Sequence, residues 1–78
     1  MNLEIITPEK IVYKGEVVSI ILPGSKGVFQ ILNNHAPIIS TLQKGEIKIK
    51  DSNNKKDNFD VNGGVIEFQN NNAIVLID

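Results

Sequence analysis

Residues 17–37 of the chain read Val-Val-Ser-Ile-Ile-Leu-Pro-Gly-Ser-Lys-Gly-Val-Phe-Gln-Ile-Leu-Asn-Asn-His-Ala-Pro. Short apolar runs alternate here with turn residues, and no uninterrupted helical pattern is present, which favours β-strands. Residues 17–22 are largely apolar on both faces, so we expect a strand that is central in a sheet or covered on its second face. Residues 23–27 predict an exposed turn, with proline at its first corner and glycine supplying positive φ.

The same pattern of short strands and turns extends through the rest of the chain. Further segments with strand character are residues 2–7, 11–16, 46–50, 58–61, 65–68 and 73–77. Segments 11–16 and 17–22 meet beside Gly15, which suggests a hairpin or a bent strand. Turn signals at intervals of about 8 to 12 residues are typical of an all-β sandwich or barrel. We therefore expect one domain, residues 1–78, folded as a flattened β-sandwich of two mostly antiparallel sheets with short strands and little or no helix.

Composition excludes several classes of function. The 78 residues carry a formal net charge of −1, and all eight basic residues are lysine. A nucleic-acid module would present a basic face rich in arginine, so we expect no nucleic-acid partner. There is no cysteine, so thiolate metal sites and disulfides are absent. No apolar run approaches the roughly 20 residues that span a bilayer, so we expect no direct bilayer insertion.

His35 is the only histidine and the only candidate for catalysis near neutral pH. A catalytic or zinc site would need further groups beside it, and neither a cysteine nor a second histidine exists. The run Gly24-Ser25-Lys26-Gly27 lacks the spacing of a phosphate-binding P-loop. We therefore expect no enzyme, no metal and no cofactor. A small hydrolase would depend entirely on His35.

A free-standing β-sandwich that binds peptide or carbohydrate is the alternative, because fold alone does not fix function. For a carbohydrate site, Tyr13 is the only aromatic candidate with a polar group. Two apolar features, residues 17–22 and the pair Ile38-Ile39, fit either a sheet covered by a partner or a thick intrinsic core.

The order of several short runs carries a resemblance over the whole chain. The runs are residues 3–9, residues 15–22, the Pro-Gly turn leading to Ile-Leu and His-Ala-Pro in residues 23–37, Leu42 with Gly45, Gly63-Gly64 before Val65 and Glu67, and Val75-Leu76. In this order the chain resembles the N-terminal β-sandwich domain of the epsilon subunit of F-type ATP synthases. Gln30 stands where the family usually has glycine, and Asn33-Asn34 replace its usual Pro-Gly. Asparagine also adopts turn and left-handed conformations, so the turn is retained chemically.

The resemblance implies a non-catalytic rotor subunit of the central stalk of a proton-translocating F-type ATP synthase, which links gamma to the c-ring and couples proton flow to ATP synthesis. Family analogy assigns a c-ring-facing loop, Ser25, Lys26, Gly27 and Val28, and gamma-facing residues, His35, Ala36, Pro37 and Ser40. It also implies a peripheral position on the cytoplasmic face of the bacterial plasma membrane, through the complex. Family members usually continue into a helical hairpin that inhibits ATP hydrolysis or binds ATP. Because this sequence stops at Asp78, we expect no inhibitory hairpin and no nucleotide binding.

Overall fold

The computed structural model describes all residues, 1–78, and contains nine β-strands and no helix. The strands are β1 (Asn2–Ile6), β2 (Ile11–Glu16), β3 (Ser19–Gly24), β4 (Gly27–Leu32), β5 (Ile38–Leu42), β6 (Gly45–Lys50), β7 (Lys56–Val61), β8 (Gly64–Gln69) and β9 (Asn72–Ile77). No helix long and apolar enough to cross a membrane is present.

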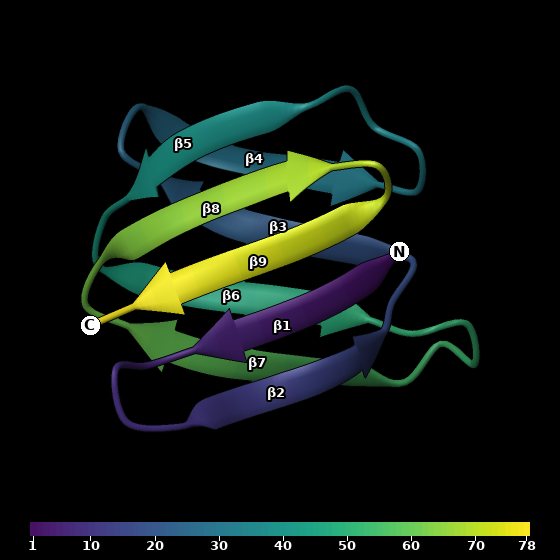
Figure 1. Cartoon of the computed structure of the whole chain (residues 1–78), viewed down its shortest axis with the longest axis horizontal. Coiled ribbons are helices and arrows are strands. Elements are labelled where there is room, and N and C mark those ends of the chain that lie inside the picture. Colours follow the sequence, from purple (N-terminus) through teal and green to yellow (C-terminus); the bar gives the residue numbers. More distant parts are fainter.

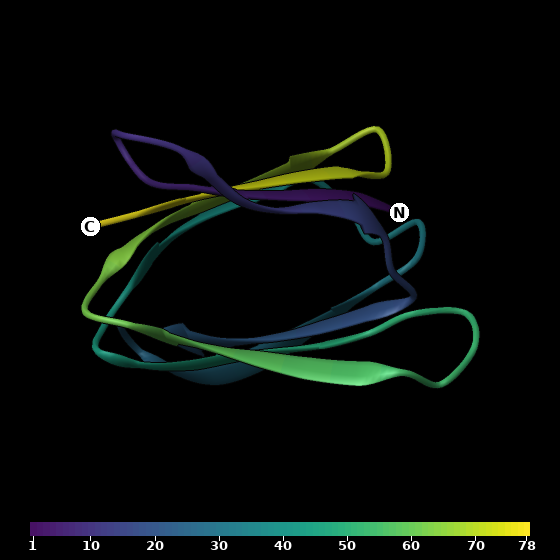
Figure 2. The ribbon, with the colours of Figure 1, turned by 90° about the horizontal axis from the view of Figure 1, so that it is seen from below.

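The strands form two stacked layers (Figures 1 and 2). One layer has the order β2-β1-β9-β8-β5, and the other contains β4, β3, β6 and β7. Neighbouring strands are antiparallel except for β1 and β9, which pair in parallel. A single residue pair between β3 and β5, Gly24 with Leu42, joins the layers at one edge, so hydrogen bonding makes them one curled sheet. The expected sandwich is confirmed, and its overall extents of 28 × 24 × 18 Å show the expected flattening.

The core lies between the layers and follows the two-residue period of the strands. In β6, for example, Ile47 and Ile49 are buried while Glu46 and Lys48 are exposed. Alternate side chains of a strand point to opposite faces, so each layer contributes one apolar face to a shared core. Fifteen buried hydrophobic residues form this core, and the largest of them is Phe68.

The third strand begins two residues later than the sequence predicts. β2 and β3 do not pair, because β2 lies in one layer and β3 in the other. Of the two expected alternatives, a hairpin or a bent strand, the hairpin is therefore wrong. Val17 belongs to the crossing between the layers and is buried there, with its amide donating to the Met1 carbonyl at 2.9 Å. The strand itself is central in its layer, between β4 and β6, as its apolar character predicts.

The predicted turn at residues 23–27 is tighter than expected. Pro23 and Gly24 lie inside β3, and the turn itself consists of Ser25 and Lys26. Proline is tolerated there because β6 pairs with β3 only over residues 19–21, so no ladder partner is deprived of a donor at Pro23. The Pro23 carbonyl instead accepts a bond of 2.9 Å from the Gln43 amide.

Candidate functional site

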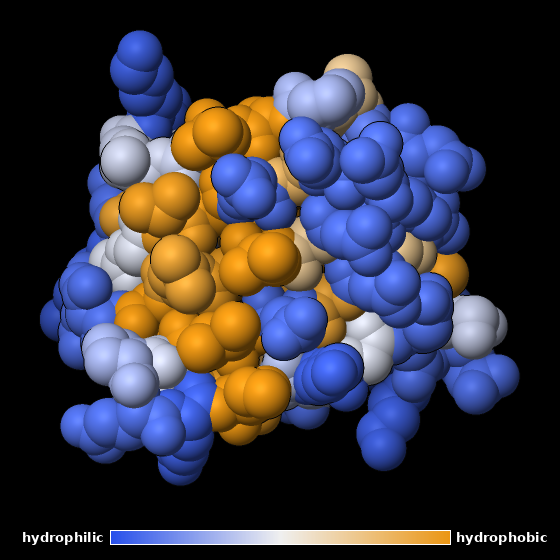
Figure 3. Space-filling model, viewed as in Figure 1, coloured by the Kyte–Doolittle hydropathy of each residue, from blue (hydrophilic) through white to orange (hydrophobic).

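The outer face of the five-stranded layer carries a band of apolar side chains, which we call the apolar stripe (Figure 3). Its members come from all five strands of the layer: Ile11, Ile6, Leu76, Ile74, Val65 and Ile39. The most exposed are Ile39 at 71%, Ile11 at 55% and Leu76 at 53%. Contiguous exposed apolar surface on a soluble domain marks an interaction site more often than a scatter of single residues does.

Strand register brings the members of the stripe together. Val65 is the cross-strand partner of Leu76, Leu76 is the partner of Ile6, and Ile6 is the partner of Ile11. One row of apolar side chains therefore crosses four strands without interruption. In the adjacent row Glu67 lies between Ile39 and Ile74. The stripe is thus apolar along one row and is interrupted by the charged side chain of Glu67 in the next row.

The β3–β4 turn forms a second candidate surface, at one end of the sandwich. An open hollow of about 660 Å³ lies between this turn and β5, and Ser25, Lys26, Gly27 and Val28 are among its lining residues. The Ser25 amide donates to the Thr41 carbonyl at 3.0 Å, and the hydroxyls of the two residues are 2.8 Å apart. These bonds fix the turn to β5 and leave Val28, which is 72% exposed, projecting into solvent.

The structure separates Ser25 to Val28 from His35, Ala36 and Pro37, whereas Ser40 lines the same hollow as Ser25 to Val28. Ser25 to Val28 lie at the start of β4, and His35 to Pro37 follow its end, so the four strand residues 29–32, about 13 Å of strand, lie between them. All of these residues are exposed. Ser40 differs from the others of its group, because its cross-strand partner Ile66 is buried and its side chain therefore points toward the core side.

The side chain of His35 contacts the backbone and an aromatic ring. Its Nδ1 is 2.7 Å from the Ala36 carbonyl, to which it donates, and its ring lies edge-on to Phe68 with centroids 6.2 Å apart. The structure holds no group of three or more His, Cys, Asp or Glu side chains that could bind a metal ion. These contacts give His35 a turn-packing position.

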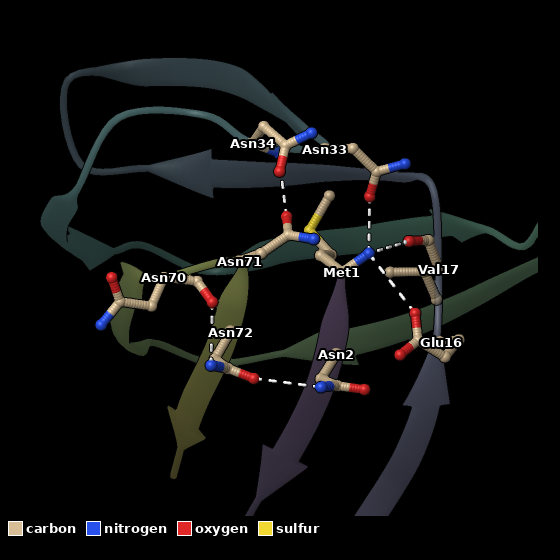
Figure 4. Close-up of polar contacts among 9 residues, drawn as sticks. All are labelled: Met1, Asn2, Glu16, Val17, Asn33, Asn34, Asn70, Asn71 and Asn72. Atoms are coloured by element: carbon tan, nitrogen blue, oxygen red, sulfur yellow. Dashed lines mark hydrogen bonds and ion pairs between the residues drawn. The ribbon is translucent and has the colours of Figure 1, made fainter.

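An asparagine cluster holds the His35 loop against the β8–β9 turn (Figure 4). Asn70 and Asn71 form a two-residue hairpin turn, both with positive φ (50° and 59°), as in type I′ turns. Asn71 Oδ1 accepts a bond of 2.8 Å from the Asn34 amide, and Asn34 itself has a φ of 64°. Asn33 Oδ1 accepts a bond from the Met1 amine. The two asparagines that depart from the family pattern therefore both have defined structural roles.

Tyr13 lies at the contact between β2 and β7. Its ring packs edge-on against Phe59 with centroids 5.7 Å apart, which joins β2 to β7 across the layers. Burial raises the pKa of the Tyr13 hydroxyl above its ordinary value, and the negative charges of Asp51 and Asp57 raise it further. No aromatic residue is among the exposed large hydrophobic side chains, so the surface lacks the aromatic platform that a carbohydrate site would use.

Sequence reasoning found only part of the apolar stripe. It singled out Ile39, but it missed Val65, Ile74, Leu76, Ile6 and Ile11. Their apolar character was visible in the sequence, whereas their assembly into one surface depends on the order and register of the strands. Within residues 17–22, Ile20 and Leu22 are fully buried between the layers, whereas Ile21 faces outward and is only partly buried.

The whole chain, residues 1–78, matches the family described as ATP synthase, Delta/Epsilon chain, beta-sandwich domain. The chain belongs to this family. The ATP synthase epsilon chain of Leptospira borgpetersenii is 47% identical over 78 residues, which are 100% of this chain and 61% of the relative. The epsilon chain of Chlorobium limicola is 41% identical over 77 residues, which are 99% of this chain and 88% of the relative.

Solved structures show the same fold at low sequence identity. A chain in the cryo-EM structure of the Euglena gracilis mitochondrial ATP synthase (OSCP/F1/c-ring) has a TM-score of 0.90 at 19% identity, over 96% of this chain and 48% of that one. A chain of the Tetrahymena thermophila mitochondrial ATP synthase central stalk and c-ring has a TM-score of 0.81 at 19% identity, over 99% of this chain and 62% of that one. The family fold is therefore retained over residues 1–78.

Proposed function

We propose that the chain is the β-sandwich part of a non-catalytic rotor subunit in the central stalk of a proton-translocating F-type ATP synthase. In this role it links gamma to the c-ring and helps couple proton flow to ATP synthesis. Membership of the Delta/Epsilon family over residues 1–78 is the observation that carries the proposal. We infer a peripheral position on the cytoplasmic face of the bacterial plasma membrane, held there by the complex.

We assign gamma to the apolar stripe. An apolar row that crosses four strands, with Ile39 exposed on the fifth, suits a partner that remains bound, since the core of a stable interface is apolar and depleted of charge. The exposed loop of His35, Ala36 and Pro37 lies beyond the end of β5 that is nearer Ile39, so gamma bound over Ile39 can also reach this loop.

We assign the c-ring to the β3–β4 turn, residues 25–28. The turn projects from one end of the sandwich and is tied to β5 by its bonds to Thr41. A linking subunit must hold two partners at once, and the turn at Val28 and the stripe around Leu76 provide two surfaces on one rigid body, which adjoin at Ile39. Transmission of torque requires this rigidity, which the nine paired strands supply. We assign no inhibitory or ATP-sensing role to residues 1–78.

Two charge substitutions test the assignment of the surfaces. Leu76→Asp places a carboxylate in the stripe, and we expect it to weaken binding to the cognate gamma subunit by about 30-fold, the size of an interface hot spot. Binding to the c-ring should persist in this variant. Val28→Asp should show the reverse pattern. Because both side chains are exposed, each variant serves as the folding control for the other.

Binding is measured by co-elution and calorimetry with purified gamma and purified c-ring. Absence of any complex between the unmodified chain and gamma at micromolar concentration would overturn the proposed function. If gamma binds but tolerates Leu76→Asp, the apolar stripe is not its docking surface.

A further inference from the structure

The outer face of the second layer, opposite the apolar stripe, carries a small basic hollow of about 240 Å³. Lys48, Lys50 and Lys56 line it, together with the polar residues Ser19, Gln30 and Asn58. No acidic residue lines it, although the chain as a whole has a net charge of −1. Three of the eight lysines therefore gather at one hollow of a slightly acidic protein.

Strand register causes this gathering. Lys50 on β6 is the direct cross-strand partner of Lys56 on β7 and of Ser19 on β3. Lys48 is the partner of Asn58 on β7 and of Ile21 on β3, so residues from adjacent strands converge on the same point. Like charges directly opposite each other destabilise a sheet, so the Lys50–Lys56 pair is unfavourable for folding alone.

The carboxylates of this face do not neutralise the two opposed lysines. Glu46 and Asp60 are direct partners of each other, farther along the same two strands. Glu46 approaches Lys48 at 3.9 Å, whereas neither Lys50 nor Lys56 takes part in an ion pair. The face is thus divided into a positive end and a negative end.

Neutral donors complete the positive end. Gln30 Nε2 donates to Ser19 Oγ at 2.9 Å, which leaves the Ser19 hydroxyl hydrogen free to donate to another acceptor. The Asn58 side-chain amide adds two further N–H groups. Ammonium groups with hydroxyl and amide donors around a small hollow are the set of groups that binds phosphate oxygens.

We propose that this hollow binds a phosphate-bearing anion. The two unpaired ammonium groups of Lys50 and Lys56, with that of Lys48 beside them, match the multiple charge of a diphosphate or of a phosphate ester better than the single charge of a carboxylate. The hollow has no aromatic lining, so recognition ends at the phosphate groups and a nucleotide base adds no affinity. The site is independent of the surface assigned to gamma, because it lies on the layer opposite the apolar stripe and stays open when the stripe is covered.

Titration of the ¹⁵N-labelled chain with sodium pyrophosphate, at constant ionic strength, tests the site by NMR. We expect saturable shifts of the amides of Ser19, Gln30 and Asn58. Lys50→Gln should weaken binding about tenfold, the effect of losing one charge-assisted hydrogen bond. The matched variant Lys14→Gln removes a lysine from the other layer and should change the affinity less than about twofold, through long-range charge alone.

Lys56→Glu separates binding from folding. It places a carboxylate opposite Lys50, so the thermal midpoint should not fall while pyrophosphate binding is lost.

Sedimentation with phosphatidylglycerol vesicles, with phosphatidylcholine vesicles as the control, distinguishes a lipid headgroup from a free phosphate as the source of the anion. Binding to either the vesicles or pyrophosphate that depends on Lys50 supports the site. Two results would overturn the site. One is amide shifts that do not saturate, together with no binding to vesicles. The other is an equal loss of pyrophosphate affinity in Lys50→Gln and Lys14→Gln.

Discussion

Substitutions at Asn71 test how the His35 loop is held in place. Asn71 makes two separable contributions: its side-chain oxygen accepts the Asn34 amide at 2.8 Å, and its backbone adopts a φ of 59°. Asn71→Ala removes the acceptor and places a Cβ-bearing residue without a polar side chain in the left-handed region. Asn71→Gly removes the acceptor only, and Asn71→Asp retains an oxygen at the same position.

The expected magnitudes follow from exposure and backbone geometry. Asn34 is exposed, so water replaces the lost acceptor and the bond contributes only about 0.5 kcal/mol to stability. The left-handed conformation costs alanine about 1 to 2 kcal/mol more. We therefore expect the free energy of unfolding to fall by about 2 kcal/mol for Ala and about 0.5 kcal/mol for Gly, with Asp close to the unmodified chain.

Thermal unfolding followed by circular dichroism measures these differences. For a domain of this size 1 kcal/mol corresponds to about 4 to 8 °C, so the midpoint should fall by about 10 °C for Ala and about 3 °C for Gly. Equal midpoints for the Ala and Gly variants would refute the backbone argument. An Asp variant as unstable as Ala would refute the role of the side-chain acceptor.

Two further predictions concern the hydroxyl of Tyr13 and the glycines of the turns. Because the pKa of Tyr13 is raised above 10.0, its contribution to stability is fully present below pH 10 and is lost as the pH rises through the folded-state pKa. Absorbance at 295 nm should report this pKa directly, since Tyr13 is the only tyrosine and tryptophan is absent, and a titration midpoint at or below 10.0 would contradict the burial argument. Gly64→Ala should lower the free energy of unfolding by about 3 to 5 kcal/mol, measured with denaturant. Gly64 has a φ of +155°, and an added Cβ would lie 2.2 Å from the Leu76 carbonyl oxygen. Gly27→Ala, at a φ of +132° with no atom within 4 Å, should cost only about 1 to 2 kcal/mol, and equal losses would show that steric contact at Gly64 is unimportant.

Local patterns in the sequence predict most of the fold. The alternation of apolar and charged residues in residues 46–50 correctly predicts which face of β6 is buried. The apolar run that contains Ile20 and Leu22 correctly predicts a strand that is central in its layer. Asn34, where the family usually has glycine, does adopt the left-handed conformation expected of it. These features depend on two-residue periodicity and on turn chemistry, which are properties of neighbouring residues.

The errors arose where distant residues decide the outcome. The apolar run from Val17 predicts one strand, yet Val17 is buried in a crossing between the layers, where its amide donates to the Met1 carbonyl. The apolar stripe depends on β9 lying between β1 and β8, and the basic hollow depends on Lys50 facing Lys56. Strand order and register are set by the whole chain, so neither surface could be assembled from the sequence alone.

Site-specific cross-linking within the gamma, chain and c-ring complex tests the linking role most directly. The chain has no cysteine, so Leu76→Cys and Val28→Cys each introduce a single reactive thiol at an exposed position. With a short thiol-to-amine cross-linker, mass spectrometry should find Leu76→Cys joined to gamma and Val28→Cys joined to a c subunit in the same assembly. Both thiols joined to one partner, or neither joined to any, would contradict a chain that connects gamma to the c-ring through two separate surfaces.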